Sequence, residues 1–363
     1  MTEIKVPMAK PVFEDEEING IMEVVKSGWL GQGKVTEKFE SALSEYLGTN
    51  VVAVNNGSSA TMCALLAHDI KPGDNIVVPD FTFISTSSVP KILGANIIPV
   101  DIDPETLNID LNSLEKIVSK NDVKMTIFVD IAGLPNEINS LIDLSKKFDF
   151  LLLEDAAEGL GSEYKNKKLG SFDHTSFFSF HIAKLITTVE GGCITTQDSE
   201  LTKKLKAIRD LGRYQPGYKH DIIGSNFRIT DFQSVIGLNQ LKKVERFISR
   251  RIEVAKIFKN EIKNLTFQSI PDYVTRHSYM LFFAKTKNEK MRDLYVKKLR
   301  ENGIDARLSF FPLHLQPCNP ELLQYDCPNS KKVYDTIFTL PMYNSLTDDD
   351  VNLIIKTCNE IDP

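Results

Sequence analysis

Between about residues 50 and 200, apolar and polar positions follow two different patterns. Short apolar runs rich in Val, Ile and Phe predict strands, and stretches with helical spacing separate them. The predicted strands are 50–54, 75–78, 96–100, 125–129, 150–153, 175–180 and 193–196. Strands that are apolar throughout are buried on both faces, which is typical of a mainly parallel sheet covered by helices. The pattern therefore predicts an α/β fold.

A long helical pattern follows this region, over about 231–264, and predicts a helix that connects two domains. Its Arg250 and Arg251 are expected on a solvated face. We expect a large domain over 1–245 and a smaller α+β domain over 246–363.

The pattern of the smaller domain predicts a strand at 279–284, a helix at 289–302 and a final helix led by Thr347. Three aspartates follow Thr347 directly, and carboxylates are favoured at the positive end of a helix dipole. We interpret this acidic run as a helix start and not as a metal site.

A glycine-rich segment at 28–35 nearly matches a nucleotide-binding P-loop. Val35 stands where the magnesium-binding Ser or Thr is required, and the preceding residues 18–27 predict a helix where the motif needs a strand. The segment therefore favours a glycine-rich turn after the first helix and excludes an NTPase.

Composition adds limits to this picture. The chain has 363 residues, 42% of them hydrophobic and 25% charged, with a formal net charge of −6. An acidic chain has little to gain from counterion release on a nucleic acid, so no nucleic-acid partner is expected. We find no membrane-spanning run or signal segment, so the expected location is cytoplasmic, without a membrane partner. The five cysteines include no CxxC pair, which predicts reduced thiols and no metal site.

Candidate chemistry begins at Glu154 and Asp155, which follow the apolar run 150–153. Ligands of open α/β sheets bind at the carboxyl ends of the strands, so acids placed there are candidates for function. A carboxylate beneath a pyridine nitrogen would keep that nitrogen protonated, and Asp155 suits this role.

Lys184 lies in the segment between the predicted strands 175–180 and 193–196, close to Ser179 and His181. Apolar surroundings would make its amine a better nucleophile and a proton carrier. A lone lysine in such a segment is usually solvated. The flanking pattern favours function here, and with Asp155 it predicts a pyridoxal 5'-phosphate (PLP) enzyme with a Lys184 Schiff base.

A third candidate feature is the run Asn56-Gly-Ser58-Ser59, where a strand ends and a helix begins. Free N–H groups, small hydroxyls and the helix dipole form an anion cradle, although a plain N-cap explains the run equally well. Phe83 ends another strand and could stack on a flat ring, while a core aromatic is the usual explanation.

Together these motifs resemble the DegT/DnrJ/EryC1/StrS family of sugar aminotransferases, PLP enzymes of the aspartate-aminotransferase-like fold type I. The resemblance covers almost the whole chain. The matching segments are 27–33, 56–60, 79–83, 94–103, 154–158, 179–184, 190–192, 224–228, 312–317 and 340–341.

The resemblance implies roles for individual residues. Lys184 would hold PLP, Asp155 would bond its ring nitrogen, Glu158 would approach its ring hydroxyl and Phe83 would stack on the ring. The phosphate ligands it implies are Ser58, Ser59, Ser179 and, from a neighbouring subunit, Asn226. That last contact implies a homodimer with shared active sites. Two departures from the family pattern are Asp130, where many members carry histidine, and Ser58, where threonine is commoner.

The implied reaction moves the amino group of L-glutamate to a keto group of a nucleotide-linked deoxy sugar. The stretch 303–314 resembles perosamine-synthase-like enzymes, which act at C4 of a 4-keto-6-deoxy hexose. Arg307 and His314 are therefore candidate substrate contacts, with an exposed ion pair and a satisfied core histidine as open alternatives. Trp29 and His181 are further candidates.

Other functions within the same fold remain alternatives: a 3-keto sugar aminotransferase, a PLP-dependent dehydratase, or a PLP-binding regulator without catalysis. A dehydratase would carry histidine in place of Lys184. A cysteine-sulfur enzyme would need a mobile cysteine, and Cys193 is expected in a core strand. The sequence does not select among GDP, dTDP and UDP as the nucleotide.

Overall fold

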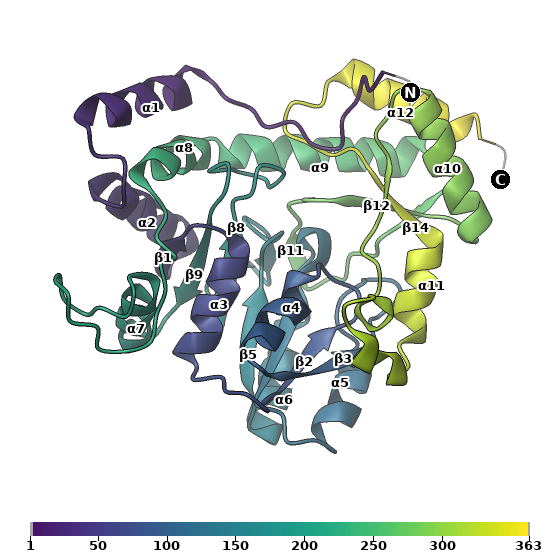
Figure 1. The fold of residues 1–363 in the computed structure, drawn as a ribbon. Helices are drawn as coiled ribbons and strands as arrows, with labels where there is room; N and C mark the ends of the chain where they lie inside the picture. The colour runs from purple at the N-terminus through teal and green to yellow at the C-terminus, as the bar shows by residue number, and fades with distance from the viewer. Residues whose placement is uncertain (1–2, 362–363) are drawn as a thin grey trace.

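A computed structural model describes residues 3–361 and builds them around a seven-stranded sheet (Figure 1). The strand order is β1-β9-β8-β5-β4-β2-β3, and β9 runs antiparallel to both of its neighbours while the other pairs are parallel. The strands are β1 (Asn50–Val54), β2 (Asn75–Pro79), β3 (Asn96–Val100), β4 (Met125–Val129), β5 (Leu151–Asp155), β8 (Thr175–Ser179) and β9 (Gly192–Thr196). The predicted α/β fold with a mainly parallel sheet is confirmed.

Helices cover both faces of this sheet because every strand is buried on both sides. They are α1 (Asp15–Ser27), α2 (Lys34–Leu47), α3 (Gly57–Ala67), α4 (Ser85–Ile92), α5 (Leu111–Val118), α6 (Ile138–Phe148) and α7 (Ser199–Arg209). Residues of α3, α4 and α7 pack with Val52 and Leu153 on one face. Residues of α5 and α6 pack with Leu152 on the other face. Successive residues of β5 therefore point into different layers.

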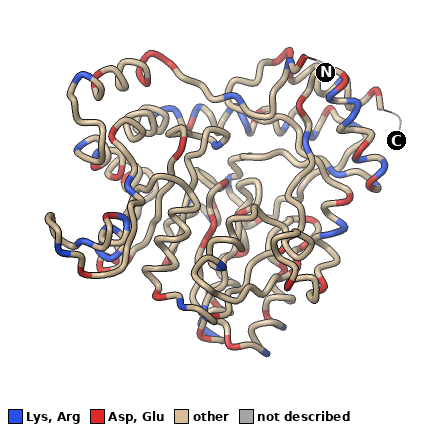
Figure 2. Tube along the Cα trace, viewed as in Figure 1, with Lys and Arg blue, Asp and Glu red and all other residues tan. Residues whose placement is uncertain are grey.

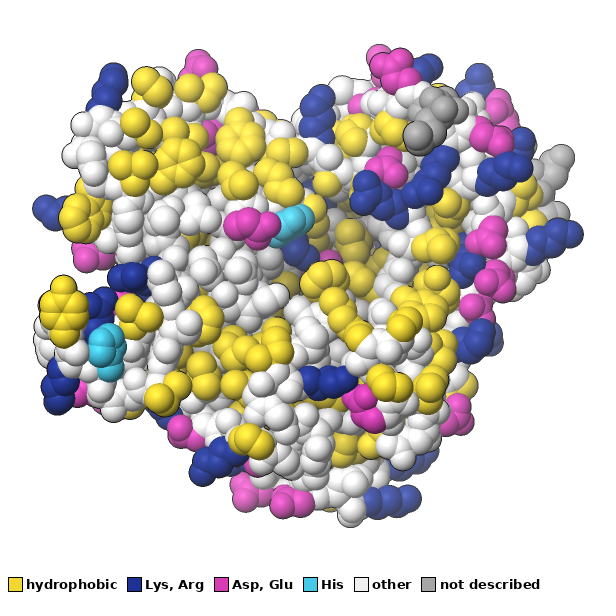
Figure 3. Space-filling view, viewed as in Figure 1, with side chains coloured by type: hydrophobic (Ala, Val, Ile, Leu, Met, Phe, Trp, Pro, Cys, Tyr) yellow, Lys and Arg dark blue, Asp and Glu magenta, His cyan; other side chains and the backbone are white. Residues whose placement is uncertain are grey.

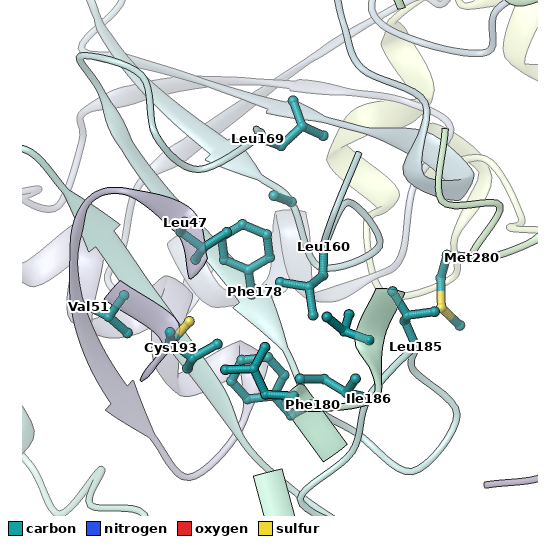
Figure 4. Packing of buried hydrophobic residues seen from close by; sticks show 14 of the residues in the cluster. Leu47, Val51, Leu160, Leu169, Phe178, Phe180, Leu185, Ile186, Cys193 and Met280 are labelled. Atoms are coloured by element: carbon teal, nitrogen blue, oxygen red, sulfur yellow. The ribbon is translucent and has the colours of Figure 1, made fainter. Parts of the chain in front are cut away.

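The α2 side of the sheet contains the core cluster shown in Figure 4. Phe178 and Phe180 of the β8 region pack there with Leu160, Leu185 and Ile186. Two of these residues, Leu185 and Ile186, directly follow Lys184 in the chain. The segment that carries the candidate lysine is thus anchored in the core.

The second part of the chain forms a four-stranded antiparallel sheet of order β10-β12-β14-β13. Its strands are β10 (Thr266–Phe267), β12 (Phe282–Lys285), β13 (Arg307–Leu308) and β14 (Ile337–Leu340), and its helices are α10 (Glu289–Glu301), α11 (Pro328–Thr336) and α12 (Asp348–Asn359). The Thr347 side chain accepts from the N–H of Asp350, which confirms the predicted helix start. The N-terminal segment reaches this region, where Val6 forms a β-bridge with Ile304 (Figure 1).

A three-stranded sheet of order β11-β6-β7 links the two parts of the chain. Its strands are β6 (Glu163–Tyr164), β7 (Lys167–Lys168) and β11 (Val274–Arg276). Short 3-10 helices η1 (Ile131–Gly133), η2 (Leu313–Leu315) and η3 (Pro320–Gln324) complete the elements.

The predicted connector over 231–264 is two helices, α8 (Asp231–Leu241) and α9 (Val244–Glu261). The expectation that Arg251 faces solvent is wrong, because this side chain is 2% exposed. Its guanidinium donates to Asn344 Oδ1 at 2.8 Å and to the carbonyls of Tyr279 and Met280 at 2.9 and 3.0 Å. These acceptors come from other segments, so the helix pattern alone could not show them.

Acidic and basic residues are interspersed along the tube in Figure 2, in keeping with the small net charge. The face seen in Figure 3 is hollowed in its middle, and hydrophobic side chains gather beside the hollow. Among residues 3–361, no helix combines the length and apolar character needed to cross a bilayer.

Candidate active site

Asp155 ends β5 and points to the layer of α3 and α4. Its side chain is 5% exposed, and it accepts hydrogen bonds from the Thr86 hydroxyl at 3.2 Å and the Ala157 N–H at 3.1 Å. Burial raises the pKa of Asp155 to about 7, although the Ala157 hydrogen bond and the nearby charge of Lys184 oppose the rise. The carboxylate therefore lies in a place that would stabilise a further cationic or N–H donor.

Lys184 lies in the connection between β8 and β9, and backbone hydrogen bonds within this connection hold its conformation. The N–H of Phe180 donates to the Gly191 carbonyl at 2.8 Å, and that of Thr188 donates to the Phe180 carbonyl at 2.9 Å. The Lys184 side chain is 19% exposed, and its Nζ lies 3.2 Å from Glu158 Oε1. It is not the fully solvated lysine that a surface loop would carry.

The other carboxylate oxygen of Glu158 is hydrogen-bonded to the backbone of η1. Its Oε2 accepts the N–H of Ala132 at 2.8 Å. Ala132 has φ +61°, a left-handed conformation that costs a non-glycine residue free energy. The backbone thus adopts a costly conformation in which it donates to the carboxylate next to Lys184.

Glu154 points to the opposite layer and is completely enclosed. Its Oε2 accepts from the Gly170 N–H at 2.9 Å, the His174 ring at 3.3 Å and the Ser176 hydroxyl. Asp130 Oδ1 accepts from the N–H and the Nδ2 of Asn136 at 3.0 and 2.9 Å. Burial first, and then the Glu154 charge, raises the pKa of Asp130 well above its ordinary value. The acid at position 130 is therefore buried near a second buried acid, Glu154.

The candidate anion cradle lies at the start of α3. Asn56 caps this helix by accepting the Ser59 N–H at 2.7 Å, and the first-turn N–H groups of Gly57 and Ser58 have no partner within the helix. A Cβ placed on Gly57 would lie 3.1 Å from the Cβ of Ser179. The structure therefore brings Ser179, from the end of β8, against the helix start that carries Ser58 and Ser59.

Phe83 follows β2 and is 57% exposed, so it is not a core aromatic. The Thr82 hydroxyl lies 3.1 Å from that of Thr86, which contacts Asp155. This chain of contacts ties the Phe83 segment to the buried carboxylate. Sequence reasoning missed Thr86, although its polar run at the start of α4 was a usable signal.

The remaining candidates lie in different surroundings. Trp29 is 64% exposed and donates from Nε1 to the Gln32 carbonyl at 3.2 Å. His181 is exposed, with Nε2 3.7 Å from Glu190 Oε1. Asn226 is exposed and accepts from the Arg228 side chain at 2.9 Å. The contacts of these residues with a substrate or a second subunit stay predictions.

Arg307 and His314 both have partners within the chain. The Arg307 guanidinium lies 2.6 Å from Asp305 Oδ2 at the surface. His314 is 7% exposed, and its Nδ1 lies 2.6 Å from Asp80 Oδ2. These contacts correspond to the ion pair and the satisfied histidine left open by the sequence.

Comparison with known proteins decides the family. The chain matches the model of the "DegT/DnrJ/EryC1/StrS aminotransferase family" over residues 11–359. The chain belongs to this family. Because its members are PLP enzymes, the chain is a PLP-dependent aminotransferase, and the expected enzyme class is confirmed.

Individual relatives agree with this assignment over their full length. The GDP-perosamine synthase of Escherichia coli O157:H7 is 32% identical, with 98% of each chain covered. The uncharacterized protein MJ1066 of Methanocaldococcus jannaschii is 34% identical, over 98% of this chain and 97% of the relative. The solved structure of Spr1654 from Streptococcus pneumoniae in its PLP form has a TM-score of 0.92 at 26% identity, over 98% of this chain and 97% of that chain. The fold type I architecture is confirmed.

The residues present fit PLP. The cofactor carries a pyridine nitrogen, a phosphate and a planar ring. The buried Asp155 lacks a cationic partner other than the nearby Lys184 among the described residues, the helix start at Gly57 has small side chains and free N–H groups, and Phe83 exposes its ring. Each part of the cofactor would meet a group of matching chemistry.

Proposed function

We propose that this aminotransferase binds PLP through Lys184 and Asp155 and transfers the amino group of L-glutamate to a nucleotide-linked keto-deoxy sugar. The cluster at the ends of β5 and β8, in which Lys184 contacts Glu158 and lies near the buried Asp155, is the observation that carries the proposal. Bound PLP supplies an electron-accepting ring next to the reacting carbon.

The residues of the chain have distinct tasks in this proposal. Asp155 holds the proton on the ring nitrogen, and Glu158 orients the Lys184 amine and the ring hydroxyl. Ser58, Ser59 and Ser179 hold the phosphate, and Phe83 covers the ring. Asn226 completes the phosphate site of a neighbouring subunit, so that the active unit is a homodimer.

Lys184 Nζ also moves the proton at the reacting carbon. Glu158 Oε1, at 3.2 Å, stabilises the ammonium form and fixes the direction from which the proton is delivered. The half-buried site keeps bulk water from competing for that proton.

The sugar acceptor is proposed from the relatives and from the 303–314 stretch. The E. coli relative is a GDP-perosamine synthase. A 4-keto-6-deoxy hexose linked to a nucleotide is therefore the first candidate, with amination at C4. Trp29, His181 and Arg307 are the side chains proposed for its recognition. His314 was a further candidate from the sequence, but its Nδ1 lies 2.6 Å from Asp80 Oδ2, which favours the alternative of a satisfied histidine.

The glutamate half-reaction tests the proposal. Wild-type protein loaded with PLP should release 2-oxoglutarate in an amount equal to the enzyme and lose the visible absorbance of lysine-bound PLP. Lys184→Ala should do neither, whereas the exposed Lys120→Ala should behave as wild type. A protein that takes up no PLP would refute the proposal.

A panel of sugars tests the acceptor. GDP-, dTDP- and UDP-linked 4-keto sugars and the corresponding 3-keto sugars are supplied with glutamate, and the products are identified by mass. An amino sugar formed from 3-keto sugars alone would show that the C4 assignment is wrong.

A further inference from the structure

A second buried polar cluster lies at the end of β2, away from Lys184 in the chain. It consists of Asp80, His314 and Cys327, which are 0%, 7% and 2% exposed. One ligand atom from each, a carboxylate oxygen, a ring nitrogen and a thiol sulfur, lie within 4.8 Å of one another. Three different metal-binding groups are thus gathered from three separate segments, the end of β2, η2 and the N-cap of α11.

The cluster is fixed by backbone hydrogen bonds. The N–H of Leu313 donates to the Asp80 carbonyl at 2.8 Å, and that of His314 donates to Asp80 Oδ1 at 2.7 Å. Asp101 accepts the N–H groups of Asn329 and Ser330 at 3.0 and 2.9 Å, which holds the start of α11 beside Cys327. The three ligands are therefore placed before any ion arrives.

His314 and Cys327 also line a cavity of about 490 Å³. The His314 side chain is 9% exposed; its Nδ1 contacts Asp80, and its Nε2 has no hydrogen-bond partner among the described residues. Nδ1 is therefore the ring nitrogen that lies in the cluster, and Nε2 is free to carry the ring proton. The cavity provides both an access route and room for water.

The local charge favours a cation. The carboxylates of Asp80, Asp101 and Asp326 lie near the Cys327 thiol. Their negative field attracts a metal ion. Lysines at the cavity wall, Lys287, Lys331 and Lys332, oppose this field, and Lys331 is paired with Asp335.

We propose that Asp80, His314 and Cys327 bind a divalent transition-metal ion of the zinc class. Carboxylate, imidazole and thiolate are all zinc ligands, and a water from the cavity completes a tetrahedron. One carboxylate and one thiolate neutralise the ion, as a buried site requires. On binding, the Cys327 proton leaves to solvent, and the His314 proton moves from Nδ1 to the unpartnered Nε2. The bound ion joins η2 and α11 to the end of β2.

X-ray absorption at the zinc edge tests this in the full-length PLP-loaded protein with one equivalent of zinc. The expected signal is one sulfur at about 2.3 Å with nitrogen and oxygen at about 2.0–2.2 Å. A shell of nitrogen and oxygen without sulfur, or no bound zinc after gel filtration, would overturn the proposal.

Cysteine variants separate this site from adventitious binding. Cys327→Ser should lose the sulfur signal and bind zinc at least tenfold more weakly, while the exposed Cys318→Ser should match wild type. A sulfur signal that persists in Cys327→Ser, or is lost in Cys318→Ser, contradicts the assignment. Zinc should raise the melting temperature of wild type but not of Cys327→Ser, and the wild-type spectrum decides the question even if the variant does not fold.

Discussion

The two acids at the end of β5 are neighbours in sequence but belong to different regions of the molecule. Glu154 faces the layer of α6, where Gly170, Ser176 and His174 all donate to it. Asp155 faces the layer of α4, where Thr86 and Ala157 donate to it and Lys184 lies near. Three donors fixed within the protein converge on Oε2 of Glu154, whereas Asp155 has one donor on each oxygen and lies near Lys184.

This difference shows how one strand can serve stability and chemistry at once. The alternation of a strand sends successive side chains to opposite faces. The donors on Oε2 stabilise the Glu154 carboxylate and lower its pKa, whereas burial destabilises the Asp155 carboxylate, which a ligand can relieve. Burial raises the pKa of Asp155 to about 7, which reflects this destabilised carboxylate.

The largest expected effect is on catalysis and comes from a change at Asp155. Asp155→Asn should lower the transamination rate by about 10²–10⁴-fold, the scale on which groups that supply a proton contribute. The fold should persist because the asparagine Oδ1 can accept the Ala157 N–H while its Nδ2 donates to the Thr86 hydroxyl. Steady-state kinetics with saturating PLP measures the change, and a variant with near-normal rate would remove Asp155 from the site.

A change at Glu154 should lower the stability of the fold. Glu154→Ala leaves the Gly170 N–H, the Ser176 hydroxyl and the His174 ring without their acceptor, and we expect a loss of about 3–5 kcal/mol in the free energy of unfolding. Denaturant titration measures it, with the exposed Glu200→Ala as control. If both acids reduced activity alike without loss of stability, the contrast between the two sides would fail.

The two sides should also differ in their dependence on pH. The raised pKa of Asp155 means that the folded chain keeps a proton that the unfolded chain loses, so this group lowers stability as pH rises from about 4 to about 7. Without PLP, Asp155→Asn should be more stable than wild type at pH 8, by roughly 2–4 kcal/mol, and similar at pH 4. Unfolding of the PLP-free proteins at both pH values measures the difference. Equal stabilities at pH 8 would contradict the raised pKa of the buried Asp155.

The smallest expected effect is on PLP affinity and comes from a change at Ser179. Ser179→Ala removes one proposed phosphate donor and should raise the dissociation constant of PLP about tenfold, the value of one hydrogen bond to a charged group. Fluorescence titration with PLP measures it, and Ser199→Ala at the exposed start of α7 serves as the control. An unchanged affinity would remove Ser179 from the cradle.

Much of the fold was predictable from sequence because the main strands are short apolar runs. β1, β3 and β4 match the predicted bounds, and β5 is displaced by only a few residues. The break between α8 and α9 was missed because Lys242 and Lys243 are ordinary helix residues and no glycine or proline marks the break. Arg251 was misplaced because its buried acceptors come from segments distant in sequence.

The candidate site was predictable where local motifs carry it. Asp155 ends a strand that the apolar pattern marks, and Lys184 lies in the connection between two such strands. The partners of Glu154 could not be predicted, because their contacts depend on the register between β5 and β8. The grouping of Asp80 with Cys327 is still less visible, since the two residues meet only after the second part of the chain folds against β2.

The antiparallel course of β9 has a mechanical consequence. The segment between Ser179 and Gly192 leaves the middle of the sheet and re-enters it beside the same strand, with Leu185 and Ile186 embedded below. Lys184 is therefore part of a segment that is anchored at both ends, unlike the tip of a mobile loop. Such anchoring suits a nucleophile that must meet many successive substrates at one point in space. Any movement that opens the site for a bulky sugar must therefore involve the surrounding segments and not the segment that carries Lys184.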